Sequence, residues 1–390
     1  MWKIFPRERT YLDIAAGISG NPSSPHAEGR TEREKLEHAR TRIARLIESK
    51  ADDVIFTGGA TEANALAILG TVRTYQRMYG RTYVLYAPGA HASIVENVKL
   101  AEAEGAVTEP LPIKDCQVDC QALATMLRGE TALITMEAVC GETGVVWNTR
   151  EIARVLEKSG HPMSTFWPRL HVDASQAAWT QVLKRARFGA DLLTLDSSKV
   201  CEARGIGCLV APRTIPLMPL YGGGGQERGL VPGSEAPALA TAFAEGLERA
   251  AASREAFHIH ALSMRAKLVE RIRAGIPGML VNESTVNQDP HILNISLLAP
   301  TSPGSDGTPR DTDYLVALLD EAGFAVSTKS ACESDSGAGS RAVLALYGGP
   351  ERAASTLRVS WGPTTHELDL SRFATALIRA VAFIDSSKAP

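Results

Sequence analysis

The chain has 390 residues, which at roughly 100–200 residues per domain predicts two or three cores, or one large core with an appendage. Hydrophobic residues make up 44% of the sequence and charged residues 22%, a balance that excludes global disorder. The net charge of −3 excludes a general electrostatic attraction to nucleic acid or to an acidic membrane.

The sequence contains no sign of a membrane segment or of a metal site. No uninterrupted apolar run approaches roughly 18 residues, so no spanning helix is expected. The N-terminus lacks the apolar core of a signal peptide, which predicts a cytoplasmic protein whose six cysteines are thiols. Cys116 and Cys120 are not followed by a second ligand pair, so we expect no metal there.

Helical and extended patterns alternate through the first two thirds of the chain. Apolar residues at helical spacing between Leu36 and Ile47 predict an amphipathic helix, and further helices are predicted near 63–69, 92–104 and 149–158. Apolar runs of strand length separate them, at Asp53–Thr57, Tyr83–Tyr86, Ala132–Met136, Leu170–Val172, Leu192–Leu195 and Ile206–Val210. Strands that are apolar on both faces and alternate with helices predict a mainly parallel α/β sheet.

The pattern changes at the Pro/Gly-rich segment from Pro212 to Gly233. A long helix is predicted from about Ala236 to Ala274, and its middle, Ala250 to Glu255, is the predicted hinge to a second domain. Beyond it, the elements expected are strands at Ile292–Leu298 and Thr356–Ser360 and helices at Thr312–Ala322 and Arg341–Tyr347. The predicted domains are therefore 12–250 and a smaller α/β domain, 251–390, with the segment 1–20 packing near the latter.

Several residues with useful chemistry follow predicted strands, where ligands gather in open parallel sheets. Ala60 and Thr61 open a helix, and their free backbone amides and the Thr61 hydroxyl suit a phosphate; a plain turn with a threonine cap is the alternative. Asp173 ends a strand and is either a helix cap or the partner of a protonated pyridine nitrogen, as pyridoxal phosphate requires.

Three further residues have both an ordinary and a chemical interpretation. Lys199 is either a solvated surface charge or a Schiff-base lysine. His91 is either a capping or core histidine or an aromatic plane that stacks on a cofactor ring and acts as acid and base. Cys332 lies in a polar, glycine-rich stretch, which is the composition of an exposed, mobile loop where a thiol can react.

Seven motifs, in order and sensibly spaced, resemble those of one family. They are Tyr11–Asp13, Gly20–His26, Phe56–Glu62, His171–Gln176, Gly223–Gly229, Ser330–Ser334 and Leu357–Gly362. Through them the chain, from Tyr11 to about Leu370, resembles the cysteine desulfurases, in the class-V aminotransferase branch of the fold-type-I pyridoxal-phosphate enzymes. The resemblance implies an α/β fold with a mainly parallel seven-stranded sheet in a large domain and a smaller α/β C-terminal domain.

The resemblance also implies how the cofactor, pyridoxal 5'-phosphate, would be held. Lys199 would bind its aldehyde and later move the α-proton of the substrate, while Asp173 would hold the pyridine nitrogen. Gln176 would contact the phenolic oxygen of the ring, and His91 would stack on the ring. The phosphate would be received by Ala60, Thr61 and Ser198, with Ser234 reaching it from the partner subunit of a homodimer.

By the same resemblance, Arg358 would clamp the substrate carboxylate with its planar fork. Cys332 would attack the sulfur of L-cysteine, so that a persulfide remains on the enzyme and alanine is released. The persulfide would then pass to a sulfur-acceptor protein, for iron–sulfur cluster assembly or for thiolation of tRNA or a cofactor. No contact with nucleic acid or a membrane is implied.

The chain departs from the family at four places. Only Ile14 to Ser19 remain of a longer segment with a helix, and the family's Asn-Asn is Cys140-Gly141. The usual Ser-x-His before the lysine is Asp196-Ser197-Ser198, where a carboxylate would repel a phosphate if it faced one. Val231 replaces an arginine.

These departures leave two other functions open. The first is a different enzyme on the same fold, such as a selenocysteine lyase or another amino-acid lyase or transaminase. The second is a non-catalytic sulfur-relay or scaffold subunit, which would have little reason to keep both Lys199 and Cys332. An active desulfurase is therefore the interpretation favoured by the sequence.

Overall fold

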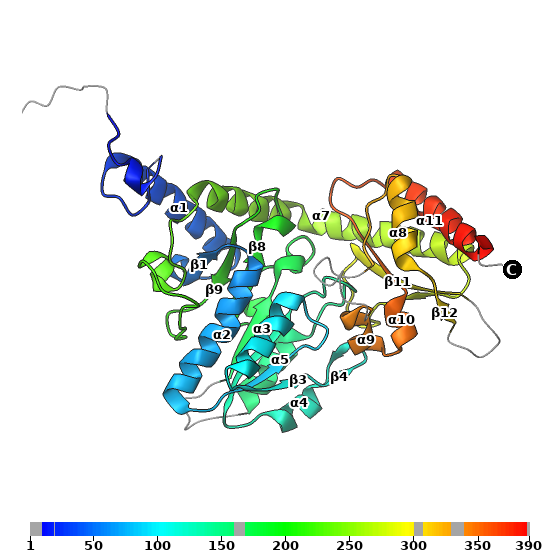
Figure 1. Ribbon diagram of the computed structural model, residues 1–390, viewed down its shortest axis with the longest axis horizontal. Helices are drawn as coiled ribbons and strands as arrows, with labels where there is room; N and C mark the ends of the chain where they lie inside the picture. Colours follow the sequence, from blue (N-terminus) through cyan, green and yellow to red (C-terminus); the bar gives the residue numbers. More distant parts are fainter. Residues whose placement is uncertain (1–9, 19, 160–167, 300–306, 329–338, 388–390) are drawn as a thin grey trace, which may run out of the picture.

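The computed structural model describes residues 10–18, 20–159, 168–299, 307–328 and 339–387 (Figure 1). Cys332 lies outside these ranges. In the described part of the chain, no helix is both long enough and apolar enough to span a membrane.

A seven-stranded sheet forms the centre of the large domain, in the order β1-β9-β8-β7-β6-β2-β3. Its strands are β1 (Val54–Thr57), β2 (Tyr83–Tyr86), β3 (Val107–Pro110), β6 (Thr131–Glu137), β7 (Arg169–Asp173), β8 (Leu192–Asp196) and β9 (Gly207–Val210). Neighbouring strands from β3 to β8 pair in parallel, and only β9 runs against its neighbours β8 and β1. The predicted mainly parallel, seven-stranded α/β sheet is therefore confirmed.

The strands that the apolar pattern predicted are the buried ones. Every residue of β1, β6 and β9 is buried, because helices cover both faces of a parallel sheet. The edge strand β3 was missed. Its residues are exposed or half-buried and include Glu109 and Pro110, a composition that an edge tolerates and an interior strand does not.

Helices connect the strands of the large domain (Figure 1). They are α1 (Ala27–Leu46), α2 (Ala60–Tyr79), α3 (Ala92–Ala103), α4 (Cys120–Met126), α5 (Thr149–Lys158) and α6 (Arg185–Phe188), and a small hairpin joins β4 (Ile113–Lys114) to β5 (Gln117–Val118). The start of α2 matters most for the site. It follows Gly59, whose φ of +140° is a conformation that only glycine adopts readily.

Helix α7 (Pro237–Gly275) links the two cores and is continuous over 39 residues. Its first half, up to Ala250, packs in the core of the large sheet, and its second half, from Phe257, packs in the C-terminal core. That core also contains β10 (Met279–Val281), β11 (Ile292–Ala299), β12 (Thr308–Pro309), β13 (Thr356–Ser360), α8 (Thr312–Glu321), α9 (Arg341–Tyr347), α10 (Pro350–Ala354) and α11 (Glu367–Ser387). The cores thus change between Ala250 and Phe257, a stretch that contains the predicted hinge, and the helix does not break there.

We expected the N-terminal segment to pack near the C-terminal domain. Its described part does not lie beside that domain of its own chain. In Figure 1 it sits at the start of α1, at the opposite end of the molecule. The reason is a local set of polar contacts: Asp13 pairs with His26 at 3.0 Å and accepts a hydrogen bond from Ser24 at 2.9 Å. These contacts fold the segment back onto the helix that follows it.

Candidate active site

A cavity of about 660 Å³ lies between the two domains, at the carboxyl ends of β6, β7 and β8. Of the residues singled out in the sequence, it is lined by Ala60, Thr61, His91, Asp173, Gln176, Ser198, Lys199 and Arg358. The fold therefore brings these eight residues together. Two other residues singled out in the sequence are not among them. Ser234 does not line the cavity of its own chain, and Cys332 lies outside the described residues.

Lys199 ends the short 3-10 turn η4 (Ser197–Lys199) that follows β8. The buried Ser197 hydroxyl donates to the Ile206 carbonyl at 2.6 Å, which ties the turn to the strand beside it. The Trp179 indole donates to the Lys199 carbonyl at 2.7 Å. With its backbone held at both points, Lys199 presents an exposed side chain to the cavity.

Asp173 is the last residue of β7 and is buried. Asn64 Nδ2 donates to its carboxylate at 2.7 Å, and the Ser175 amide donates at 2.9 Å. The same Asn64 amide also donates to the Ser93 hydroxyl at 2.8 Å, which contacts His91 Nδ1 at 2.8 Å. A continuous chain of hydrogen bonds thus fixes the carboxylate and the imidazole relative to each other.

His91 caps α3, since its Nδ1 accepts from the Ser93 amide. The ordinary interpretation, a capping histidine, is therefore correct, and it coexists with a ring that lines the cavity. Desolvation by the cavity walls lowers the pKa of His91 below its usual value. The ring is consequently neutral at pH 7 and able to accept a proton.

Glu137 is a buried acid at the end of β6 that the sequence analysis missed. Its Oε2 accepts from the His91 amide at 3.2 Å, while its buried Oε1 has no hydrogen-bond partner among the described residues. Burial, with the neighbouring Asp173 carboxylate second, raises the pKa of Glu137 to about 8. Glu137 is therefore a neutral carboxylic acid at pH 7.

Arg358 is on β13 of the C-terminal domain and lines the same cavity as Lys199. Its Nη1 donates to the Gly141 carbonyl at 3.2 Å. A Cβ at position 141 would come within 3.2 Å of Gln176 Nε2, so the glycine that replaces the family's asparagine fits closely against Gln176. The neighbouring Cys140 is buried, and burial raises the pKa of its thiol well above the usual value.

Both described flanks of the segment that contains Cys332 are anchored at this cavity. On the N-terminal side, the backbone of Ser327 pairs with that of Arg358, with N···O distances of 2.6 and 3.3 Å. On the C-terminal side, the buried Ser340 hydroxyl donates to Glu142, a cavity residue, at 2.5 Å. The chain thus leaves and rejoins the described structure beside the residues that would hold a substrate.

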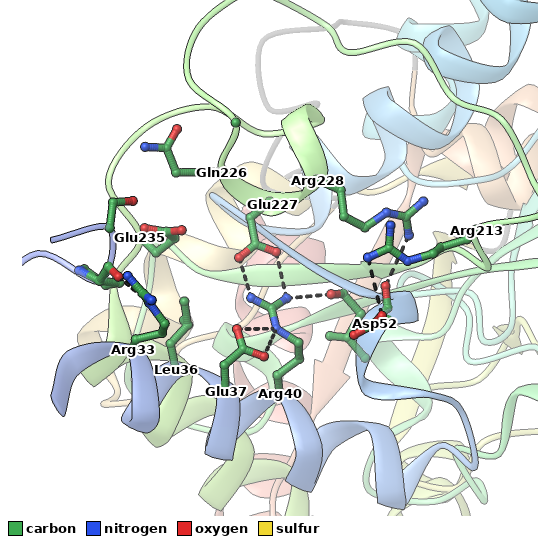
Figure 2. Close-up of a pocket in the computed structure, with 14 residues that line it drawn as sticks. Arg33, Leu36, Glu37, Arg40, Asp52, Arg213, Gln226, Glu227, Arg228 and Glu235 are labelled. Atoms are coloured by element: carbon green, nitrogen blue, oxygen red, sulfur yellow. Dashed lines mark hydrogen bonds and ion pairs between the residues drawn. The ribbon is translucent and has the colours of Figure 1, made fainter. Parts of the chain in front are cut away.

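Ser234 precedes Glu235, which lines a second cavity of about 480 Å³ (Figure 2). Its hydroxyl accepts from Asn21 Nδ2 at 3.3 Å. The glycine-rich segment that leads to it is fixed by Glu227, whose carboxylate forms a buried ion pair with Arg40 at 2.6 Å and accepts from the Phe56 amide at 2.8 Å. Figure 2 shows the two side chains meeting head-on above α1.

The residues present fit the ring end of pyridoxal phosphate well. An amine on Lys199, a fixed carboxylate on Asp173, a neutral ring on His91 and an amide on Gln176 face one cavity. The phosphate end differs from expectation. Asp196 Oδ2 accepts from the Ala60 amide at 2.8 Å, so a carboxylate already occupies the helix terminus predicted for the phosphate.

Other residues of the site were not singled out in the sequence, namely Asn64, Ser93, Trp179, Glu142 and His291. Two signals were available. Asn64 is a polar residue in the apolar run that starts α2, and Glu137 is an acid directly after the apolar run of β6. His291 left no such signal. It pairs with the buried Asp289, and the fold of the C-terminal domain brings it to the cavity.

Comparison with known proteins agrees with this site. A family model described as aminotransferase class-V matches residues 10–373. The chain is 29% identical to cysteine desulfurase IscS 1 of Archaeoglobus fulgidus over 361 residues, covering 92% of this chain and 88% of the relative. It is 30% identical to the mitochondrial cysteine desulfurase of Candida albicans over 381 residues, covering 96% of this chain and 73% of the relative.

Among solved structures, a NifS-like protein superposes with a TM-score of 0.82 over 93% of this chain and 92% of its own, at 22% identity. That likeness concerns the fold. The family model, which spans nearly the whole chain, and the curated relatives together settle the family. This chain belongs to the cysteine desulfurase family of the class-V aminotransferases.

Proposed function

We propose that this protein is a pyridoxal-phosphate-dependent cysteine desulfurase, which converts L-cysteine to L-alanine and receives the sulfur on Cys332 as a persulfide. The observation that supports this most is the convergence of Lys199 and Arg358, from two different domains, on one cavity. An amine that can bind a cofactor aldehyde and a guanidinium that can pair with a carboxylate are the two groups an amino-acid substrate needs.

The residues of this chain would divide the work as follows. Arg358 binds the substrate carboxylate, and Lys199 moves the proton at the substrate Cα. When bound, the cofactor supplies an electron sink for the electrons released at Cα. Asp173 stays in place for the pyridine nitrogen because Asn64 and Ser175 hold it.

The sulfur step involves Cys332. Its thiolate attacks the substrate sulfur, the Cβ–S bond breaks, and Cβ gains a proton, so that one L-cysteine gives one L-alanine and one enzyme persulfide. The described flanks of the segment that contains Cys332 support this assignment, because they are anchored at Arg358 and Glu142. The neutral His91 ring is placed to exchange a proton during this step.

We further propose a homodimer in which Ser234 completes the cofactor site of the partner. Ser234 is exposed, and the short segment near it exposes three large apolar side chains: Leu12 at 89%, Ile14 at 68% and Ile18 at 92%. Apolar side chains so exposed on one short segment favour contact with another chain. Light scattering should therefore give twice the chain mass, and Leu12→Asp/Ile18→Asp should shift it toward the monomer.

The fate of the sulfur and the place of the reaction also belong to the proposal. A persulfide on Cys332 has to pass to an acceptor protein, for iron–sulfur cluster assembly or thiolation. The names of the relatives support sulfur release from cysteine in this family. For the place of the reaction, we propose the cytoplasm.

The persulfide is tested directly by mass spectrometry. After incubation of the cofactor-loaded protein with L-cysteine in the absence of reductant, the peptide containing Cys332 should gain one sulfur atom. Cys332→Ala and Lys199→Ala should remove the gain, whereas Cys120→Ala, a half-buried thiol on α4, should leave it. A gain on another cysteine, with none on Cys332, would contradict the assignment.

A further inference from the structure

At the start of α2, the chain itself supplies an anion to a helix terminus in the cavity. Asp196, the last residue of β8, accepts from the Ala60 amide through Oδ2 at 2.8 Å and from the Ser198 amide through Oδ1 at 2.7 Å. Both donors point at a single carboxylate. A negative charge is favourable there, because the N-terminus of a 20-residue helix carries unpaired amides and partial positive charge.

Two further amides at this turn are also engaged. Glu62 Oε2 accepts from the Gly58 amide at 2.6 Å, and the Ala63 amide donates to the Gly59 carbonyl at 3.1 Å. Besides the neutral Glu137, the described residues that line the cavity include three acids, Glu142, Asp173 and Asp196, against two lysine or arginine side chains, Lys199 and Arg358. A phosphate monoester would therefore meet fewer free donors and more negative charge than a helix terminus normally offers.

The turn cannot make room by moving toward the sheet. Gly207, on β9, packs directly against it: a Cβ at position 207 would come within 2.7 Å of the Gly59 carbonyl carbon and 2.9 Å of the Ala60 nitrogen. The sheet side of the turn is thus in close contact with backbone. A phosphate bound to these amides has to replace the Asp196 carboxylate instead of sitting beneath it.

We propose that Asp196 is an internal competitor for the phosphate position, so that this enzyme holds pyridoxal phosphate mainly through the ring and gains little affinity from the phosphate. The proposal rests on the proposed function only in taking pyridoxal phosphate as the cofactor. Its consequence is a low selectivity for pyridoxal phosphate over pyridoxal, the same ring without the phosphate.

Binding of the two compounds can be compared without any substrate. Trp179 and Trp361 line the cavity, so quenching of tryptophan fluorescence reports occupancy, with equilibrium dialysis as the second measurement. For the unmodified protein we expect pyridoxal phosphate to bind at most about tenfold tighter than pyridoxal. In Asp196→Ser, the ratio should rise by roughly ten- to a hundredfold, the value of a regained hydrogen bond to a charged group.

Asp196→Asn removes the negative charge and keeps the size of the side chain. The asparagine oxygen can still accept from one of the two amides, so this variant should fold like the unmodified protein and still raise the ratio several-fold. Asp320→Ser, an exposed acid on α8, controls for the change in net charge and should leave the ratio unchanged. Thermal unfolding of each apo variant shows whether the turn is intact.

Two results would overturn the proposal. One is a ratio that rises less than about threefold in both Asp196 variants while their thermal unfolding stays normal. The other is an unmodified protein that already binds pyridoxal phosphate a thousandfold tighter than pyridoxal. Failure of the proposed function looks different, because it would leave these ratios as expected and give no product from L-cysteine.

Discussion

At the scale of single residues, Glu137 is the most unusual group of the site. It keeps its proton in the folded protein up to about pH 8, whereas the unfolded chain releases it above the ordinary value of 4.5. The folded state therefore binds more protons between these values, and its stability falls as pH rises from 4.5 to 8, by at most about 1.4 kcal/mol per pH unit. Glu137→Gln, which mimics the neutral acid, should abolish this loss.

The measurement is urea unfolding of the apo protein and of Glu137→Gln at pH 5, 6.5 and 8. Relative to the variant, the unmodified protein should become progressively less stable as pH rises. The buried His171, whose pKa is lowered to about 4, acts with the opposite sign below pH 6.5 but is present in both proteins. Glu102→Gln, at an exposed acid, is the matched control for the substitution itself. A pH-independent difference for Glu137→Gln would mean that Glu137 is ionised in the fold.

At the scale of elements, the buried pair of Arg40 on α1 and Glu227 connects a helix, the first strand and the glycine-rich segment before Ser234. Arg40→Met removes one partner and leaves the Glu227 carboxylate buried without its cation. We expect the free energy of unfolding to fall by about 3–5 kcal/mol. The exposed pair of Arg213 and Asp52, at 3.4 Å, is the matched control, and Arg213→Met should cost less than about 1 kcal/mol. Equal costs in denaturant unfolding would contradict the anchoring role of Arg40.

The elements also show what the sequence could predict. Long apolar runs such as Ala132–Met136 and Leu192–Leu195 gave correct strands, because burial on both faces leaves a clear pattern. The edge strand β3 and the short β10 and β12 have no such pattern. In the site, residues at strand ends were predictable from position. Asn64 and Glu137 left a weaker signal, as polar residues within or after apolar runs, and only the structure shows that they lie beside Asp173.

The N-terminal segment and Asp196 show a second limit of structure prediction from the sequence. The position of residues 10–18 depends on Asp13 meeting His26, a contact between polar side chains that leaves no periodic pattern. Asp196 was recognised as out of place in the sequence, yet only the structure shows that its carboxylate turns toward the start of α2.

At the scale of the whole molecule, the active site depends on how α7 holds the two cores apart. Ala252 is exposed on α7 between them, and Ala252→Pro would kink the helix there at a cost of about 3 kcal/mol. Pyridoxal phosphate binding, which involves the large domain, should change less than about threefold. The KM for cysteine, which depends on Arg358 of the other domain, should rise at least tenfold. Ala252→Gly, which weakens the helix without kinking it, should alter neither; an unchanged KM in Ala252→Pro would show that the domain angle does not matter.

The central claim is tested by measuring both products of the reaction together. Purified, cofactor-loaded protein is incubated with L-cysteine and excess reductant, and alanine and sulfide are quantified in the same samples. Equal amounts are expected, with both products lost in Lys199→Ala and in Cys332→Ala. Neither product from protein that demonstrably contains cofactor would contradict a desulfurase, and product from another amino acid in Cys332→Ala would point instead to a different lyase or transaminase.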